Sequence, residues 1–197
     1  SDARTKITRY PNPTNTLDKY QAGQMMGDIY GYETIGIAKS KDEMDQHLAS
    51  LPNGGQNALG TNWDAGDIMY KDLNGDGKID NGGNKYDDMG DMKKIGNNTP
   101  RYLFGLDLNA DYKGFDFRAF FQGVMKRDYW QGSAYFWGAT SLWHSTGFVE
   151  HADYFRAEAS NDLPANLNAY YPRPVFDSSK NRQRQTAYLQ NAAYIRL

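Results

Sequence analysis

The sequence predicts a mainly β fold built from antiparallel strands, and three observations support this. From Tyr102 to Val124, apolar and polar residues alternate on both sides of Lys113-Gly114, the pattern of a β-hairpin with a two-residue turn. Glycine is frequent, at 20 of 197 residues, and aromatic residues make up 14% of the chain. No apolar run approaches the roughly 18 residues of a membrane helix, although alternating membrane strands need no such run.

The expected hairpin has one apolar face and one polar face. The apolar face carries Tyr102, Phe104, Leu106, Leu108, Ala110, Tyr112, Phe115, Phe117, Ala119 and Phe121. The opposite face carries Gly105, Asp107, Asn109, Asp111, Asp116, Arg118 and Gln122, and Leu103 breaks the pattern. Each strand has about ten residues, the length that a tilted strand needs to cross a bilayer. The pattern alone fits either a water-soluble sheet with one buried face or a hairpin of an outer-membrane barrel.

The other segments are less regular. Residues 1–9 have weak strand character, and residues 40–49 predict a short helix in which Ser40 and Glu43 have the spacing of a capping box. We expect four parts: residues 1–101 as mostly loop, 102–124 as the hairpin, 125–187 as a second long loop, and 188–197 as the start of another strand. Because the last residues stop inside that strand, we expect the chain to be a piece of a longer protein.

Residues 72–80 form an alternating run of oxygen-bearing side chains that fits a calcium loop. Calcium takes about six to eight oxygen ligands, and the expected ones here are Asp72, Asn74, Asp76, the Lys78 backbone carbonyl and Asp80. The residue at the usual last ligand position is Gly83, and the candidates to replace it are Asp87, Asp88 and Asp91. Without an ion, the same residues would form turns closed by side-chain to backbone hydrogen bonds.

An aromatic cluster is the second candidate site. It contains Tyr129, Trp130, Tyr135, Phe136, Trp137 and Trp143. Flat aromatic faces can stack on sugar rings or on apolar peptide, and Trp130, Trp137 and Trp143 are the candidate ligand-binding residues. The alternative is that these rings pack in a loop core or form an interface belt.

Other kinds of site are not expected. His144 and His151, with Glu150 and Asp153 nearby, lack the spacing of a helical zinc site. The chain has no cysteine, which excludes disulfides and thiolate chemistry. A net charge of -2 without a long basic run argues against nucleic-acid binding. Because no phosphate loop is present and no carboxylate pair stands out, we do not expect an enzyme.

Several short segments follow one another in a specific order. Residues 66–80 read GDIMYKDLNGDGKID, residues 95–97 read IGN, and Pro100 follows them. Residues 112–116 read YKGFD, 121–123 read FQG, 169–173 read AYYPR and 188–197 read YLQNAAYIRL. In this order the segments resemble the SusC/RagA family of TonB-dependent outer-membrane transporters. The resemblance covers about residues 66–197, and Ala65 stands where the family usually has proline.

The resemblance implies a plugged barrel in the outer membrane of a Gram-negative bacterium. Family members import glycans or peptides, take energy from TonB through an N-terminal region absent here, and pair with a SusD-like surface lipoprotein. This chain would contribute lipid-facing strands and extracellular loops. With Lys113-Gly114 as a periplasmic turn, residues 10–100 and 125–187 would lie outside the cell. The alternative is a secreted calcium-dependent carbohydrate-binding or adhesin module; a glycan-cleaving enzyme is a third possibility.

Overall fold

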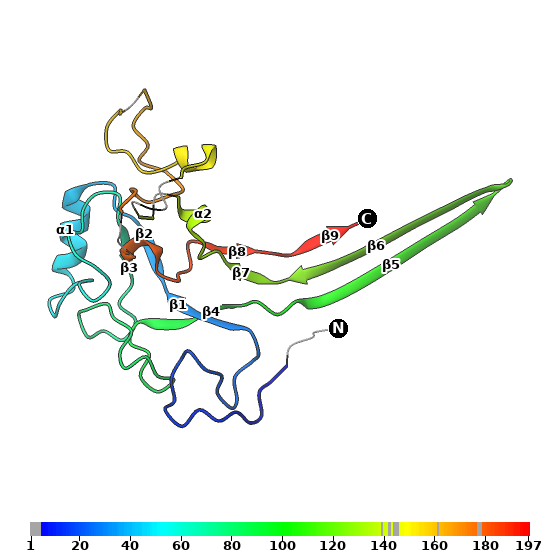
Figure 1. Ribbon diagram of the computed structural model, residues 1–197, viewed down its shortest axis with the longest axis horizontal. Coiled ribbons are helices and arrows are strands. Elements are labelled where there is room, and N and C mark those ends of the chain that lie inside the picture. The colour runs from blue at the N-terminus through cyan, green and yellow to red at the C-terminus, as the bar shows by residue number, and fades with distance from the viewer. Residues whose placement is uncertain (1–4, 139, 142, 144–145, 161, 177–178) are drawn as a thin grey trace.

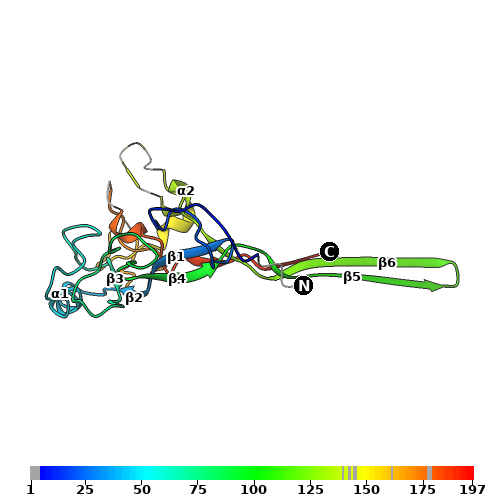
Figure 2. The ribbon, with the colours of Figure 1, turned by 90° about the horizontal axis from the view of Figure 1, so that it is seen from below.

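The structure is a computed structural model that describes residues 5–138, 140–141, 143, 146–160, 162–176 and 179–197. As predicted, the fold is mainly antiparallel β. A long hairpin of strands β5 (Arg101–Tyr112) and β6 (Phe115–Lys126) projects from a compact part that contains the other elements except β9 (Figure 1). The view turned by 90° shows the same separation, with the two strands side by side along their length (Figure 2).

The hairpin has the predicted register and turn. Tyr112 pairs with Phe115, and Leu106 pairs with Phe121. Lys113 and Gly114 have φ values of 47° and 83°, so both turn residues lie in the left-handed region that a tight two-residue hairpin turn requires. The strands extend one residue before and two residues beyond the predicted range of 102–124.

The apolar face of the hairpin is exposed. Phe115 is 79% exposed and Phe117 is 60% exposed, and no other described segment covers them. The polar face is organised by Arg118, whose guanidinium donates to both carboxylate oxygens of Asp107. Phe120 is an apolar exception on this polar face, and its ring lies beside Gly105, which has no side chain of its own.

A third strand continues the hairpin sheet. β9 (Tyr194–Arg196) pairs antiparallel with β6, which confirms the strand expected near the end of the chain. Gly123 is needed at this contact, because an added Cβ would lie 2.4 Å from the Tyr194 carbonyl oxygen and 2.8 Å from the Phe104 ring. In the described chain the order is β5-β6-β9, so the sheet is open at both edges.

The compact part contains three further two-stranded sheets. They pair β1 (Asp28–Tyr32) with β4 (Met92–Asn97), β2 (Thr34–Ile37) with β3 (Ile68–Tyr70), and β7 (Asp128–Trp130) with β8 (Leu189–Asn191). Its buried core includes Tyr32, Met44, Trp63, Ile68, Tyr70, Ile79 and Tyr188. The short helices are α2 (Ala134–Trp137), η1 (Val149–Ala152) and η2 (Lys180–Arg182). The long connections around the hairpin therefore fold together into a body with its own core.

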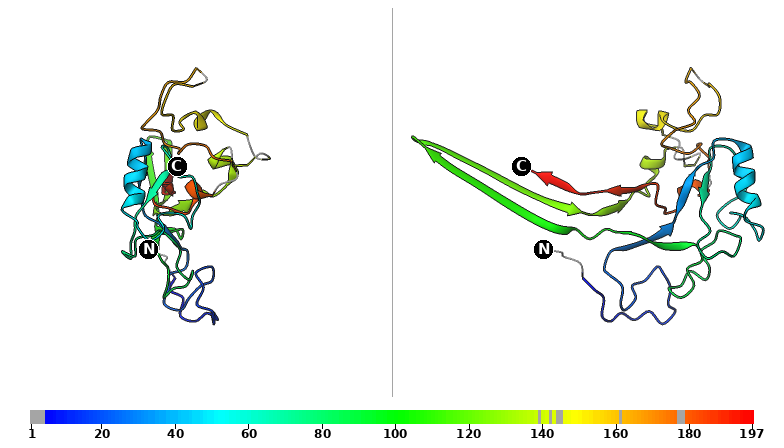
Figure 3. Two further views of the ribbon diagram at one scale, coloured as in Figure 1. Left: turned by 90° about the vertical axis from the view of Figure 1, so that its left-hand side faces the viewer. Right: turned by 180° about the vertical axis from the view of Figure 1, so that it is seen from behind.

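The predicted helix is confirmed as α1 (Lys41–Ala49), at the outer edge of the compact part (Figure 3). Ser40 caps it, with its side-chain oxygen 3.1 Å from the Glu43 backbone nitrogen. The Glu43 carboxylate accepts from the backbone N–H of Lys39 rather than from Ser40 itself. None of the helices in the described ranges is both long and apolar enough to cross a bilayer.

The weak strand predicted over residues 1–9 is wrong for its described part. Residues 1–4 lie outside the described residues, and within 5–9 only Lys6 forms a bridge, to Met25. Ile7 adds two backbone hydrogen bonds, to Gln24 and from Gly23, but no strand forms over residues 5–9.

The exposed hairpin predicts self-association in water. The 197-residue chain without detergent should form oligomers, because no described segment covers the apolar face. In detergent micelles it should be monodisperse, and Phe117→Lys with Leu106→Lys should shift the detergent-free sample toward monomer. Light scattering checks this, with the exposed α1 substitution Asp42→Lys as control. A clean monomer of the parent chain without detergent would contradict it.

Candidate functional site

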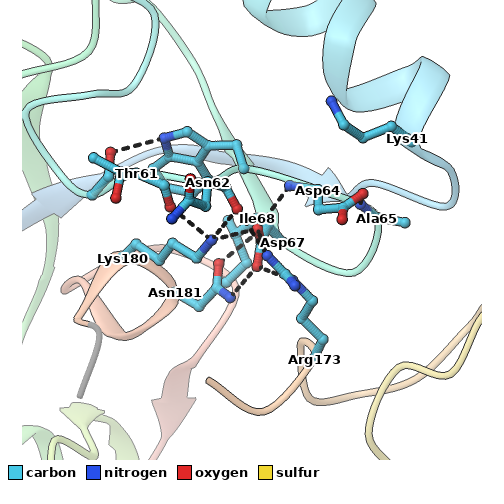
Figure 4. A network of polar contacts seen from close by, with 12 residues as sticks. Lys41, Thr61, Asn62, Asp64, Ala65, Asp67, Ile68, Arg173, Lys180 and Asn181 are labelled. Atoms are coloured by element: carbon cyan, nitrogen blue, oxygen red, sulfur yellow. Dashed lines mark hydrogen bonds and ion pairs between the residues drawn. The ribbon is translucent and has the colours of Figure 1, made fainter. Parts of the chain in front are cut away.

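The compact part is held together by a buried ionic network centred on Asp67. The Lys180 ammonium lies 2.7 Å from Asp67 Oδ2, and the Arg173 guanidinium donates to both carboxylate oxygens at 2.8 Å. Asn181 adds an amide donor at 2.8 Å. All three side chains converge on the carboxylate (Figure 4). The network thus joins the start of β3 to chain segments more than 100 residues later.

The charged groups of this network are buried, which shifts their pKa values. The side chains of Asp67 and Lys180 are 0% and 2% exposed. Burial by itself would raise the pKa of Asp67, but hydrogen bonds from Arg173, Lys180 and Asn181 outweigh it and hold that pKa below its ordinary value. Burial likewise lowers the pKa of Lys180, partly offset by Asp67. Lys180 is also held by the carbonyl oxygens of Thr61 and Asn62 and by the face of Trp63, 4.9 Å away.

The local backbone explains why Asp67 sits at this point. Gly66 has a φ of 84°, and a Cβ there would lie 2.4 Å from the Phe155 ring. Its backbone N–H donates to Ala38, and its carbonyl accepts from the N–H of Arg173. This close approach brings the Arg173 side chain beside Asp67, so two sequence segments that carried the family resemblance, 66–80 and 169–173, meet in space.

The Asp-rich loop is closed by its own backbone. The Asp72 carboxylate accepts from the N–H groups of Gly75 (2.6 Å) and Gly77 (2.9 Å). These bonds hold the pKa of Asp72 below its usual value, although burial opposes them. Asn74 Oδ1 accepts from the Asp76 N–H, and Asp76 Oδ1 accepts from the Lys78 N–H. The loop therefore has the side-chain to backbone bonds expected without an ion.

Asp91 is the candidate for the last ligand that reaches the loop. One of its carboxylate oxygens accepts from Leu73 N–H at 2.8 Å and the other from Asp80 N–H at 2.9 Å. Burial, with a further contribution from Asp72, raises the pKa of Asp91. Asp88 instead accepts from Gly83 N–H, and Asp87 accepts from the Asn15 amide. Residues 81–90 thus loop out, and the chain returns at Asp91.

A lysine occupies the outer side of the loop. The Lys78 ammonium lies 2.5 Å from Asp80 Oδ2 and 3.9 Å from Asp76 Oδ2. Among the described residues, no three Asp, Glu, His or Cys side chains are placed to hold one metal ion. Two of the five predicted ligands, the Asn74 amide oxygen and the Lys78 backbone carbonyl, belong to none of these four side-chain types. An ion at this loop would have to displace the Lys78 ammonium from Asp80.

The three predicted tryptophans are not brought together. Trp130 and Trp137 are partly buried against the core, with ring centroids 6.0 Å apart, and Trp137 packs on Tyr188 at 4.8 Å. Trp143 is 92% exposed and joins none of the ring contacts among the described residues. Phe136 packs with this group, as do Tyr170 and Tyr171 from the later segment.

The histidines lie apart from the acidic loop. His144 is outside the described residues. His151 Nδ1 accepts from the Phe148 backbone N–H, and its other ring nitrogen contacts the Phe136 carbonyl oxygen. His151 therefore stabilises η1 and α2.

The ionic network was missed by sequence reasoning. Asp67 and Arg173 belong to quoted motifs, but no local pattern links an aspartate to cations 106 and 113 residues away. The only available signal was that a charged residue interrupts an apolar strand start, between Gly66 and Ile68.

Two curated proteins resemble the chain along most of its length. It is 27% identical over 175 residues to TonB-dependent receptor P3 and 26% identical over 178 residues to TonB-dependent receptor P26, both from Formosa agariphila. Each alignment covers 89% of this chain, which spans only 14% and 15% of the length of these relatives. No protein-family model matches. These similarities support a relationship to TonB-dependent receptors, which are transporters of the outer membrane.

Replacing Asp67 should destabilise the compact part severely. Asp67→Asn leaves the Lys180 ammonium buried without a counter-charge, so we expect the free energy of unfolding to fall by about 3–5 kcal/mol. The exposed ion pair offers a matched control, because Asp45→Asn should cost about 1 kcal/mol or less. Urea titration in detergent, followed by tryptophan fluorescence, measures both.

The same pair of proteins gives a pH test. Because the folded-state pKa of Asp67 is lowered, its contribution is fully present above the ordinary carboxyl pKa of 3.8 and is lost as pH falls through the lower folded-state value. The stability difference between parent and Asp67→Asn should therefore shrink below about pH 4. A constant difference down to acid unfolding would contradict this.

Proposed function

We propose that this chain is part of a TonB-dependent importer in the outer membrane, to which it contributes barrel strands and extracellular loops. The observation that carries the proposal is the β5–β6 hairpin, which projects from the compact part (Figure 1). Its apolar face is uncovered by any described segment. The alignment of 89% of the chain with TonB-dependent receptors supports it. Transport, rather than catalysis, is the role expected of such a protein.

The dimensions of the hairpin fit a membrane. Its two strands have 12 residues each, and at about 3.3 Å per residue a tilted strand of this length covers the hydrocarbon core. Tyr102 at one end of β5 and Tyr112 at the other place aromatic rings near both expected interfaces. The open edges of β5 and β9 would pair with neighbouring barrel strands.

The short turn and the large compact part suggest an orientation. Outer-membrane barrels have short periplasmic turns and long extracellular loops. Lys113-Gly114 would therefore face the periplasm, and the compact part would lie outside the cell. A SusC/RagA-type importer at this position would meet a SusD-like lipoprotein and a glycan or peptide ligand on the extracellular side, and TonB through its N-terminal region.

Cysteine labelling tests this orientation. In the full-length protein in its host, made free of other reactive cysteines, Asp45→Cys on α1 should react with a membrane-impermeant maleimide on intact cells. Lys113→Cys at the hairpin turn should react only after the outer membrane is opened.

The labelling experiment has clear contrary outcomes. Equal labelling of both positions on intact cells would contradict the membrane hairpin. Recovery of the protein in the culture medium would favour a secreted calcium-dependent carbohydrate-binding or adhesin module instead. Lys126→Cys, at the other end of β6 from the turn, serves as a control for the extracellular end of the hairpin.

We further propose a structural calcium site at residues 72–80. The ligands would be Asp72, Asn74, Asp76, the Lys78 carbonyl and Asp80. Asp91 would hold the loop through its hydrogen bonds from the N–H groups of Leu73 and Asp80. The curvature of the loop, in which the N–H groups of Gly75 and Gly77 both donate to the Asp72 carboxylate, supports this proposal. Hard oxygen donors favour calcium over zinc, and extracellular calcium fills even weak sites. The ion would fix the loop in position without a catalytic role.

Calorimetry with Ca²⁺ tests the site. The parent chain in detergent should bind, and Asp76→Ala should lose most of that binding, whereas Asp42→Ala on α1 should leave it unchanged. Lys78→Ala keeps the backbone carbonyl but removes the ammonium from Asp80, so it should bind calcium more tightly than the parent. If neither the parent nor Lys78→Ala shows a heat of binding, the site is ruled out.

A further inference from the structure

A basic pocket lies where the hairpin joins the compact part (Figure 1). It has a volume of about 270 Å³ and is formed by β4, the starts of β5 and β7, and the end of β6. Its charged lining residues are Lys94, Arg101, Lys126 and Asp128. The whole lining belongs to the described part of the chain, and it shares no residue with the Asp67 network or the acidic loop.

Two of the cations in this pocket face each other without a counter-charge. Arg101 and Lys126 are directly opposite in the pairing of β5 with β6, and like charges in this position destabilise a sheet. Nε of Arg101 is buried and has no hydrogen-bond partner among the described residues. The Lys126 ammonium likewise makes no ion pair within the described ranges. An anion bound between the two side chains would remove the repulsion and supply the acceptor.

The other two charged side chains leave the pocket positive. Lys94 is held by Asp28 at 2.8 Å, and Asp28 is outside the pocket lining. The Asp128 carboxylate accepts from the Asn97 backbone N–H at 3.0 Å. With the Lys94–Asp28 pair set aside, two unpaired cations against the one carboxylate of Asp128 leave a net charge of +1. The pocket is therefore suited to an anionic group.

Arg101 lies beside the apolar surface of the hairpin, although strict alternation would put it on the polar face. Successive side chains of a strand point to opposite faces, but Tyr102 has a φ of 55° and is skipped in the β5–β6 pairing. The Arg101 guanidinium carbon lies 5.8 Å from the centre of the Tyr102 ring. Arginine stacked on a ring still presents N–H groups at its edge. The guanidinium is thus placed at the end of the apolar face, where aromatic rings mark a membrane interface.

An apolar groove lies next to the basic pocket. It is lined by Phe104, Val124, Met125, Ala193, Tyr194 and Ile195, at the contact between β6 and β9. Met125, directly before Lys126, is 68% exposed, and Ile195 is 73% exposed. Cations beside an exposed apolar groove match a ligand that combines an anionic head with hydrocarbon chains.

We infer that this site binds the phosphate group of lipid A, the lipid part of lipopolysaccharide. The inference rests on the proposed importer function, which puts the junction of hairpin and compact part at the outer surface of the outer membrane. Lipopolysaccharide forms that leaflet, and its phosphates lie directly above its acyl chains. Arg101 and Lys126 would bind the phosphate, because guanidinium and ammonium groups donate charge-assisted hydrogen bonds to phosphate oxygens. An acyl chain would lie in the groove beside Met125.

Binding of lipid A to the full-length protein, purified in detergent and freed of lipopolysaccharide, tests the inference. The probes are diphosphoryl lipid A, the same lipid after enzymatic removal of its phosphates, and inorganic phosphate. In native mass spectrometry, diphosphoryl lipid A should bind about tenfold or more tighter than either of the other probes. Arg101→Gln and Lys126→Gln should each weaken it by about tenfold or more, because each removes a charge-assisted hydrogen bond.

The other end of the hairpin supplies a matched control. The Lys113 ammonium lies 5.2 Å from the centre of the Tyr112 ring, so a cation over a tyrosine is repeated at the turn. Lys113→Gln removes the same charge and should leave lipid A binding unchanged. Stability separates binding from folding, because Arg101→Gln and Lys126→Gln each relieve a like-charge contact. Without lipid A, neither variant should lower the midpoint of thermal unfolding.

Several results would overturn the inference. They are no binding of lipid A, equal affinity for its phosphorylated and dephosphorylated forms, unchanged binding in both Arg101→Gln and Lys126→Gln, and an equal loss in Lys113→Gln. Inorganic phosphate bound as tightly as lipid A would show a site for free phosphate instead. Failure of the importer proposal is distinct, because the cysteine labelling would reveal it. A protein with the proposed orientation but no preference for the phosphorylated lipid would refute only this site.

Discussion

The buried carboxylate of Asp67 is the contact on which the compact part depends. A carboxylate with no exposed surface is stable only where cations and donors replace water, and Arg173, Lys180 and Asn181 supply them. These partners come from the second long connection, whereas Asp67 lies in the first, directly before β3. The ionic network therefore joins the two connections that enter and leave the hairpin, and it holds both ends of the hairpin in one body.

The molecule combines two parts that distribute their apolar side chains in opposite ways. The compact part buries its own apolar residues, such as Met44, Ile68 and Tyr70, and hydrogen-bonds its irregular backbone. The hairpin does the reverse, because its apolar side chains point outward and its backbone is paired strand to strand. Irregular backbone is tolerated in water or inside protein, whereas only paired backbone is tolerated in lipid. This division follows the boundary between the compact part and the β5–β6 strands.

Sequence reasoning succeeded where the deciding residues are close together. The hairpin, its turn at Lys113-Gly114 and the Ser40 cap of α1 each depend on signals within a few residues. The pairings of β1 with β4 and of β2 with β3 were not predicted, because these strands are short and their partners lie far away in the sequence. The family motifs contained Gly66 and Gly123, but only the structure shows that both lie where a side chain would collide with a neighbouring segment.

The sequence pattern of residues 72–80 determines the shape of the acidic loop but not whether it binds calcium. Its shape requires no ion, because the N–H groups of Gly75 and Gly77 compensate Asp72 and the Lys78 ammonium compensates Asp80. The backbone donors do not compensate the repulsion between the carboxylates of Asp91 and Asp72. This repulsion adds to the effect of burial in raising the pKa of Asp91. A divalent cation beside these carboxylates would reduce that repulsion and favour the ionised form of Asp91. The contribution of calcium would therefore be to lock an arrangement that the backbone already sets, and its binding would weaken as Asp91 takes up a proton.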